Sequence, residues 1–237
     1  MIFNLQLLID NLELYFEGLI LTLHLVALSL IIGFLLSIPL ATIRAGKNNF
    51  VNKIAWSYTY FFRGTPLLLQ IYLIYFGMGQ FDLIKDSFLW FFLKEAYFCA
   101  LLTFILNTTA YTSEIIAGAL KNMPKNQVEA AKAFGMNDRQ IYWRLILPNS
   151  LRRCIPPYSN EVIFMIHGSA LVSVITLTDI TGAASYLYSK YYDPFTPFIG
   201  AALIYLCLIF VVVYGFKILE KKFMSYLSHK IVLKKSQ

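Results

Sequence analysis

The chain has 237 residues, 58% of them hydrophobic and only 14% charged, with a mean hydropathy of +0.63 and a formal net charge of +7. A soluble domain of this length does not need so much apolar surface. The composition therefore excludes a soluble globular protein and predicts an all-α chain that crosses a membrane several times. The three cysteines (Cys99, Cys154 and Cys207) lack the spacing of disulfide or metal-ligand pairs, so we predict no metal site.

Five apolar segments are long enough to cross a bilayer as helices. The first carries no charged residue, and at a rise of about 1.5 Å per residue it covers a hydrocarbon core about 30 Å thick. A signal peptide would begin with positive charge, whereas only acidic charges precede this segment. We predict one membrane domain over residues 1–237, with spans at about residues 19–43, 54–76, 96–120, 155–177 and 198–216.

Lys and Arg are distributed very unequally between the two sides that these spans define. Sixteen lie on one side, in a loop with Arg44, Lys47 and Lys53, in a polar insert at residues 121–153 and in the C-terminal tail, whereas three lie on the other side. By the positive-inside rule, the insert and the C-terminus are cytoplasmic and the N-terminus is outside. The distribution also accounts for the net charge in a chain surrounded by membrane lipid, and we expect no nucleic acid partner.

The polar insert has the signals of two short helices. The first is predicted over about residues 126–134 and is followed by Gly135 as a left-handed C-cap. The second has Asn137 as its N-cap, with Gln140 at the capping-box position. It is predicted to end at Pro148, which lacks an N–H group and disrupts a helix interior. Such an amphipathic pair either rests on the lipid surface or docks into a groove of another protein.

Seven residues of the insert form a pattern with fixed spacing: Glu129, Ala130, Ala131, Gly135, Leu145, Leu147 and Pro148. The pattern resembles the EAA loop of the membrane subunits of bacterial ABC importers, which usually have Ile at the position of Leu145. Residues 63–68, 107–114 and 158–161 are similar to the polar amino acid permeases, especially the histidine and arginine subunits. The resemblance covers roughly residues 12–226. It implies a type I ABC importer permease fold with cytoplasmic coupling helices, in a bacterial inner membrane.

The resemblance also implies partners and a function. The expected partners are a cytoplasmic ABC ATPase dimer that holds ATP and Mg²⁺ and grips the seven insert residues, a periplasmic amino acid-binding protein, and a second permease subunit, identical or homologous. The implied function is import of basic amino acids (arginine, histidine, lysine or ornithine) by alternating access. A permease for another polar amino acid such as glutamine, and a self-sufficient secondary transporter, are the alternatives; the paired repeats typical of secondary carriers are not visible.

The sequence contains none of the motifs that would make the chain itself an enzyme. It has no G-x-x-x-x-G-K-[ST] phosphate loop, no H-E-x-x-H and no G-x-S-x-G arrangement. We therefore predict no catalytic residue and no cofactor bound by this chain.

Charged residues inside the spans are costly, so each needs a reason: a functional site, a buried contact between helices or a side chain that reaches the interface. Gly64 and Pro66 are predicted to interrupt the second span near mid-depth. The N–H groups freed there, together with Arg63 and Thr65, form a candidate site for a substrate carboxylate. Helix breaking without ligand contact is the alternative. Glu161, in the fourth span, is a candidate ligand for the ammonium or guanidinium group of a cationic amino acid.

Two roles for Glu161 stay open, substrate binding and a structural ion pair. In arginine-type relatives, as the resemblance implies, this Glu and an acidic residue seven positions later bind the basic side chain. The later position here is Gly168, so another span or a partner subunit would complete the pocket. Pairing of Glu161 with Arg152 or Arg153 is the structural alternative.

Three polar residues of the third span have structural interpretations. Asn107 and Tyr111 are one helical turn apart and suit hydrogen bonds between helices. Glu114 lies near the cytoplasmic end of the span, and we predict that it packs near the insert rather than contacting substrate.

Overall fold

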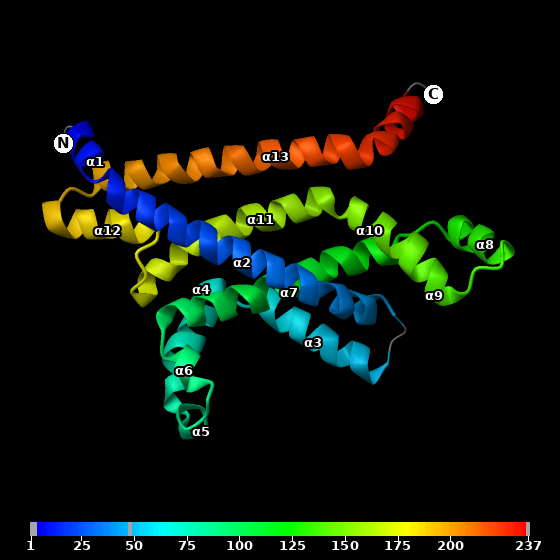
Figure 1. Cartoon of the computed structure of the whole chain (residues 1–237), viewed down its shortest axis with the longest axis horizontal. Helices are drawn as coiled ribbons and strands as arrows, with labels where there is room; N and C mark the ends of the chain where they lie inside the picture. Colours follow the sequence, from blue (N-terminus) through cyan, green and yellow to red (C-terminus); the bar gives the residue numbers. More distant parts are fainter. Residues whose placement is uncertain (1–3, 47–48, 236–237) are drawn as a thin grey trace.

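The computed structural model describes residues 4–46 and 49–235, with side chains as far as Met224, and every regular element in this part of the chain is a helix. The all-α prediction is therefore confirmed. In chain order (Figure 1) the elements are α1 Leu5–Asp10, α2 Leu12–Ala45, α3 Phe50–Gly64, α4 Leu67–Tyr72, the π-helix η1 Leu73–Gly77, the 3₁₀-helix η2 Met78–Gln80, α5 Asp82–Lys85, α6 Trp90–Leu93, α7 Ala96–Lys121, α8 Lys125–Ala133, α9 Asp138–Ile141, the π-helix η3 Tyr142–Ile146, α10 Leu147–Arg153, α11 Ile155–Ser169, the 3₁₀-helix η4 Ala170–Ile175, α12 Ile180–Tyr191 and α13 Phe195–Lys235.

Four helices of the described chain are long and apolar enough to cross a membrane: α2, α7, α11 with its extension η4, and α13. They overlap the first, third, fourth and fifth spans predicted from the sequence. Of the basic residues used for the topology prediction, Lys47 lies outside the described residues, as do the side chains beyond Met224.

The second predicted span, at residues 54–76, is not a single helix. It is divided between α3 and the shorter apolar helices that begin at Leu67. Thr65 and Pro66, between the two parts, are extended, with ψ of 143° and 135°. Proline disfavours the helical region for the residue before it and supplies no N–H group, so the chain leaves the helix here. The interruption predicted from Gly64 and Pro66 is therefore present.

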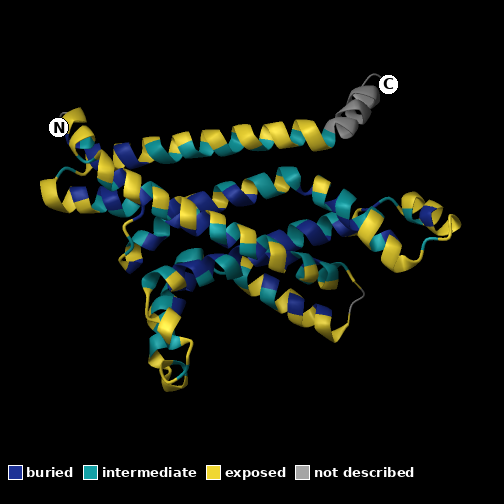
Figure 2. Cartoon of the chain, viewed as in Figure 1, coloured by how far each residue is buried: buried dark blue, intermediate teal, exposed yellow. Residues whose placement is uncertain are grey.

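Close packing between α2 and its neighbours depends on small residues. A Cβ atom added to Gly33 of α2 would overlap the Thr108 methyl group of α7. A Cβ added to Gly18 would stand 2.7 Å from the backbone carbon of Asp179. Small residues at such crossings let helix backbones approach one another in membranes. The main apolar core, around Leu25 and Phe104, lies between these helices, and Figure 2 shows the buried residues gathered along them.

The helix α12 was not predicted from the sequence. Asp179 caps this helix by accepting a hydrogen bond from the Gly182 N–H at 2.9 Å, and it also accepts one from the Tyr205 hydroxyl at 2.9 Å. The apolar face of α12 packs between α2 and α13, where Ile180 and Leu187 are fully buried. Helix α13 runs along one side of the molecule with most of its surface exposed (Figures 1 and 2).

The insert forms a helical hairpin that projects from one end of the molecule (Figure 1). After α8 the chain turns at Gly135, whose φ of 78° is left-handed, and the Met136 N–H bonds back to the Ala131 carbonyl at 3.1 Å. Asn137 and Gln140 form the predicted capping box at the start of α9. Both cap predictions are therefore confirmed.

The prediction that the second insert helix ends at Pro148 is wrong. Helical structure continues from α9 through η3 and α10 to Arg153. The π-helical segment η3 precedes the proline, and the Leu147 N–H bonds to the Tyr142 carbonyl, five residues back. A wider π turn changes the hydrogen-bond register just where Pro148 cannot donate, so the helix accommodates the proline within the first turn of α10.

Candidate functional site

The break between α3 and α4 is held by two buried amide side chains. Gln70 donates through Nε2 to the Phe62 carbonyl at 2.8 Å and to the Thr65 carbonyl and hydroxyl at 3.0 and 2.8 Å. Asn107 of α7 donates to Gln70 Oε1 at 3.0 Å and to the Phe62 carbonyl at 3.3 Å. A broken helix leaves backbone groups without partners, and these amides replace the partners that the helix would have supplied.

Gln70 was not predicted from the sequence, whereas Asn107 forms the interhelical hydrogen bonds predicted for it. The available signal for Gln70 was a polar amide four residues after Pro66 in an otherwise apolar stretch. Such a residue has the reach to satisfy the carbonyls of the preceding break.

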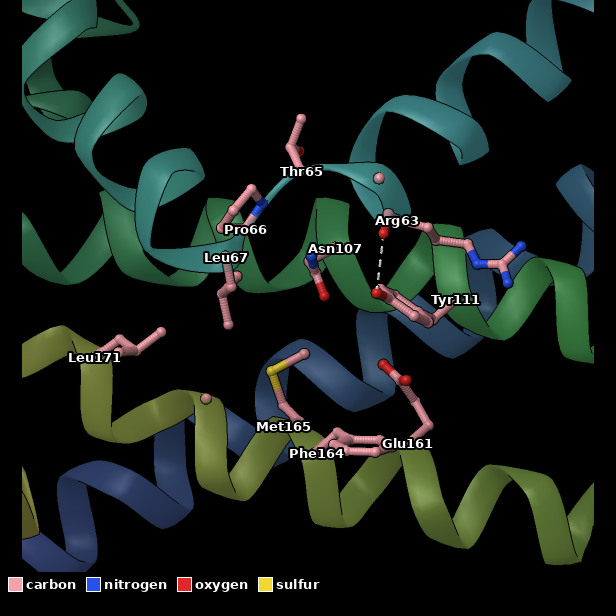
Figure 3. Close-up of a pocket in the computed structure, with 12 residues that line it drawn as sticks. Arg63, Thr65, Pro66, Leu67, Asn107, Tyr111, Glu161, Phe164, Met165 and Leu171 are labelled. Carbon is pink, nitrogen blue, oxygen red and sulfur yellow. Dashed lines mark hydrogen bonds between the residues drawn. The ribbon is translucent and has the colours of Figure 1, made fainter.

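A cavity of about 550 Å³ opens beside this break. It brings together Arg63, Gly64 and Thr65 from the break with Glu161 from α11, although almost a hundred positions separate them in the sequence. Figure 3 shows the α3–α4 break and α7 on one side and α11 on the other. The remaining lining residues are Pro66, Leu67, Asn107, Tyr111, Phe164, Met165, Gly168 and Leu171.

The two charged residues of the cavity differ in their surroundings. The Arg63 guanidinium is exposed and lies over the Tyr111 ring, with Cζ 5.4 Å from the ring centroid. The Tyr111 hydroxyl donates to the Arg63 carbonyl at 3.2 Å and so fixes the end of α3, as expected for an interhelical hydrogen bond (Figure 3). Glu161 is 5% exposed and forms no ion pair within the described part of the chain.

The structural alternative for Glu161 is not realised. Its carboxylate does not pair with Arg152 or Arg153, because the ion pairs of the described residues are Arg44–Glu114, Lys85–Asp82 and Lys132–Asp138. Arg153 instead donates to the Asn122 carbonyl at 3.4 Å. A carboxylate in an apolar-lined cavity gains most from a cationic partner, since an unpaired buried charge is costly.

Gly168 lies on the same face of α11 as Glu161 and lines the same cavity. A Cβ atom at this position would stand 2.7 Å from Leu67 Cδ2, at the far end of a flexible side chain. The cavity in this chain therefore contains one carboxylate, from Glu161, and one guanidinium, from Arg63.

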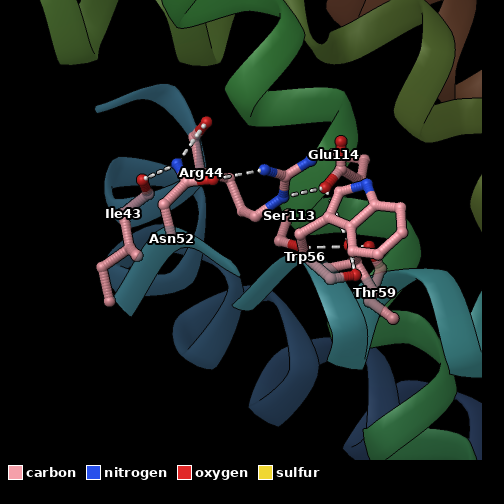
Figure 4. Close-up of polar contacts among 8 residues, drawn as sticks. Ile43, Arg44, Asn52, Trp56, Thr59, Ser113 and Glu114 are labelled. Carbon is pink, nitrogen blue, oxygen red and sulfur yellow. Dashed lines mark hydrogen bonds and ion pairs between the residues drawn. The ribbon is translucent and has the colours of Figure 1, made fainter. Parts of the chain in front are cut away.

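Glu114 belongs to a separate polar network outside the cavity (Figure 4). Arg44 Nε donates to Glu114 Oε1 at 2.5 Å, and the Thr59 hydroxyl donates to the same oxygen at 2.9 Å. Arg44 also donates to Asn52 Oδ1 at 3.0 Å. The prediction that Arg44 lies in a basic loop is wrong. Arg44 lies in the last turn of α2, where it neutralises Glu114 and joins α2, α3 and α7.

The seven insert residues that match the EAA pattern fall into two groups, one buried or half-buried and the other exposed. Ala131 and Leu147 are buried at 8% and 6% exposure, and Leu145 and Pro148 are half-buried. Glu129, Ala130 and Gly135 are exposed. Two large aromatic residues of the insert are exposed as well: Phe134, beside Gly135, at 89% and Trp143, in η3, at 58%. Exposed aromatic side chains on a projecting hairpin are typical of a surface that docks against another protein.

Comparison with known proteins identifies the family. Residues 33–225 match the model of the binding-protein-dependent transport system inner membrane component. The chain belongs to this family. The octopine transport system permease protein OccM of Rhizobium radiobacter is 43% identical over 204 residues, which cover 86% of this chain and 83% of that protein. The histidine/lysine/arginine/ornithine transport system permease protein HisM of Salmonella typhimurium is 39% identical over 91% of this chain and 92% of its own length.

The permease fold is also found among solved structures. A crystal structure described as an amino acid ABC transporter with histidines is 30% identical, with a TM-score of 0.83, over 94% of this chain and all of the matched chain. An inward-facing structure of the MetNI methionine ABC transporter has a TM-score of 0.72 at 15% identity and supports the fold alone. The resemblance noted in the sequence is therefore confirmed, and this permease is a transport subunit.

Proposed function

We propose that this chain is the membrane-spanning permease subunit of an ATP-driven importer of basic amino acids: arginine, histidine, lysine or ornithine. The single observation that carries the proposal is the cavity in which Glu161 lies opposite the α3–α4 break, with no cation of the described residues paired to it. The transport systems of the relatives, which include one for histidine, lysine, arginine and ornithine, support the same class of substrate.

Each end of a basic amino acid has a matching group in the cavity. Glu161 accepts hydrogen bonds from the ammonium, guanidinium or imidazolium group of the side chain. Arg63 binds the α-carboxylate beside the broken helix, where Gly64 and Thr65 line the cavity. The Thr65 hydroxyl itself donates to the Phe61 carbonyl at 2.8 Å, so its part is to shape the break and not to bind the carboxylate. A second permease subunit, facing the cavity, supplies the groups that the position of Gly168 lacks.

Transport is driven from outside this chain. A cytoplasmic ABC ATPase dimer binds ATP and Mg²⁺, and its grooves hold the insert hairpin through Glu129, Ala130, Ala131, Gly135, Leu145, Leu147 and Pro148. Closure of the dimer shifts the permease pair between inward-facing and outward-facing states. A periplasmic binding protein delivers the amino acid to the outward-facing state. In this arrangement the protein lies in the bacterial inner membrane, with the N-terminus outside and the insert and C-terminus in the cytoplasm.

The test is uptake of labelled amino acids by the complete transporter, reconstituted in vesicles with its ATPase and binding protein. Replacement of Glu161 by Gln removes one charge-assisted hydrogen bond, worth about 1.5–3 kcal/mol, so lysine or arginine uptake at subsaturating substrate falls about 10- to 100-fold. The control is Lys190→Gln, an exposed charge on α12 away from the cavity, which leaves uptake unchanged. Equal uptake of lysine by the Glu161→Gln and unmodified transporters would refute the role of Glu161.

A further inference from the structure

A second cavity, of about 660 Å³, lies where α2 ends, α3 begins and α7 ends, near the base of the insert hairpin. It shares no residue with the substrate cavity. Its lining residues are Gly46, Asn52, Lys53, Trp56, Ser57 and Lys121. Among residues 4–46 and 49–224 no acidic side chain lines it, so its chemistry is that of two lysines, two small polar side chains and one indole ring.

The positive charge of this cavity is not compensated by any residue that the structure describes. Lys53 and Lys121 are exposed, and neither takes part in an ion pair among the described residues. The acidic residue of the adjoining network, Glu114, is already paired with Arg44. The N-terminus of α3 adds partial positive charge, which the C-terminal ends of α2 and α7, at Gly46 and Lys121, oppose. The two lysines therefore supply the positive charge of the site. The site therefore suits an anion.

An exposed apolar track leads away from the cavity along α3. Lys53, Trp56, Ser57 and Tyr60 follow the spacing of one helical face. The rings of Trp56 and Tyr60 stack with centroids 4.9 Å apart, and the two side chains are 48% and 66% exposed. Trp and Tyr are enriched where a membrane meets water. Trp56 thus belongs both to the charged cavity and to the apolar track beside it.

We propose that this cavity binds the phosphate headgroup of an anionic phospholipid, with its acyl chains along Trp56 and Tyr60. Lys53 and Lys121 hold the phosphate oxygens, as basic pockets between membrane helices do for anionic headgroups. The apolar track selects a lipid over free phosphate, because inorganic phosphate gains nothing from exposed aromatic rings. The proposal does not depend on which amino acid is carried.

Quenching of Trp56 fluorescence by lipids with brominated acyl chains tests this proposal. The full chain carries Trp90→Phe and Trp143→Phe, so that Trp56 is its one tryptophan, and it is placed in nanodiscs with brominated phosphatidylglycerol or brominated phosphatidylcholine. We expect phosphatidylglycerol to quench at a lower mole fraction than phosphatidylcholine. Each lysine near an anionic lipid contributes about a fivefold preference, so Lys53→Gln with Lys121→Gln brings the two lipids to the same midpoint.

Controls separate the proposal from general electrostatics and from misfolding. Lys85→Gln with Lys190→Gln removes the same charge elsewhere on the chain and should leave the preference intact. Lys53→Arg with Lys121→Arg keeps the charge and should retain it. Equal quenching by both lipids in the unmodified cavity, or a preference that survives the double Gln change, overturns the proposal. Competition by excess inorganic phosphate would indicate a free-phosphate site, and absence of quenching by either lipid would show that no acyl chain reaches Trp56; both results overturn the proposal.

Discussion

The ion pair between Arg44 and Glu114 is expected to be a main determinant of stability at the insert end of the molecule. The two side chains are 11% and 21% exposed, and the pair joins α2 to α7. Thr59 and Asn52 of α3 bond to the same pair at 2.9 and 3.0 Å (Figure 4). Replacement of Glu114 by Gln removes the negative charge while the Arg44 cation stays largely buried.

The size of the effect follows from burial. Removing one partner of a buried ion pair costs about 3–5 kcal/mol, and the residual exposure of this pair places it at the lower end, about 3 kcal/mol. At about 2–4 °C per kcal/mol for a chain of this length, the Tm of the purified chain in detergent should fall by about 6–12 °C. Thermal unfolding of the Glu114→Gln and Arg44→Gln chains measures this fall.

A double-substitution cycle separates the pair from its two members. Arg44→Gln with Glu114→Gln removes both charges, so it should cost less than the sum of the single changes, with a coupling of about 1–3 kcal/mol. The exposed pair of Lys132 and Asp138, with side chains 57% and 88% exposed, is the matched control and should contribute less than about 1 kcal/mol. A Tm change below 1 °C, on the order of the measurement error, in Glu114→Gln, or strict additivity in the cycle, would refute the reasoning.

Three further predictions concern the backbone and helix packing. Gly135→Val forces a β-branched residue into a left-handed conformation at a cost of about 1–2 kcal/mol, so proteolysis at the hairpin turn should be faster than in Gly118→Ala, and equal rates would contradict this. Gln70→Leu leaves carbonyls of the α3–α4 break unpaired and should destabilise the chain by about 1–3 kcal/mol in thermal unfolding; an unchanged Tm would argue against it. Gly33→Val should lower Tm by overlapping Thr108, and Thr108→Ser, which removes the methyl group, should restore part of the loss. If Thr108→Ser restored none of the lost Tm, the overlap with the Thr108 methyl group would not be the cause of the destabilisation.

Local chemistry could be predicted from the sequence. The break at Gly64 and Pro66, the left-handed turn at Gly135 and the cap at Asn137 each depend on one or two neighbouring residues, and all three are present. The apolar character of the spans likewise needs no tertiary information. The juxtaposition of Glu161 with the break was a hypothesis about function rather than a derived contact, and the structure places both in one cavity.

Features that depend on tertiary partners were missed or misassigned. Arg44 looked like a loop residue because its partner, Glu114, is 70 positions away. Gln70 is one polar amide in an apolar stretch. Its role in holding the break depends on the Phe62 and Thr65 carbonyls, whose positions the sequence does not give. Pro148 stops an ordinary α-helix, but a π turn before it lets the helix continue, and no simple sequence pattern predicts that turn.

The position of the insert explains how a force on the hairpin would reach the cavity under the proposed function. The hairpin connects α7 directly to α11, and these two helices supply opposite walls of the cavity, with Tyr111 on one and Glu161 on the other (Figure 3). Glu161 lies six residues beyond Ile155, where α11 begins, about 9 Å along this helix. Helix α11 is stiff over this distance, and only Cys154 separates it from α10. A rotation of the hairpin would therefore move the Glu161 wall relative to the α7 wall, while the Arg44–Glu114 pair keeps α2, α3 and α7 together as one unit.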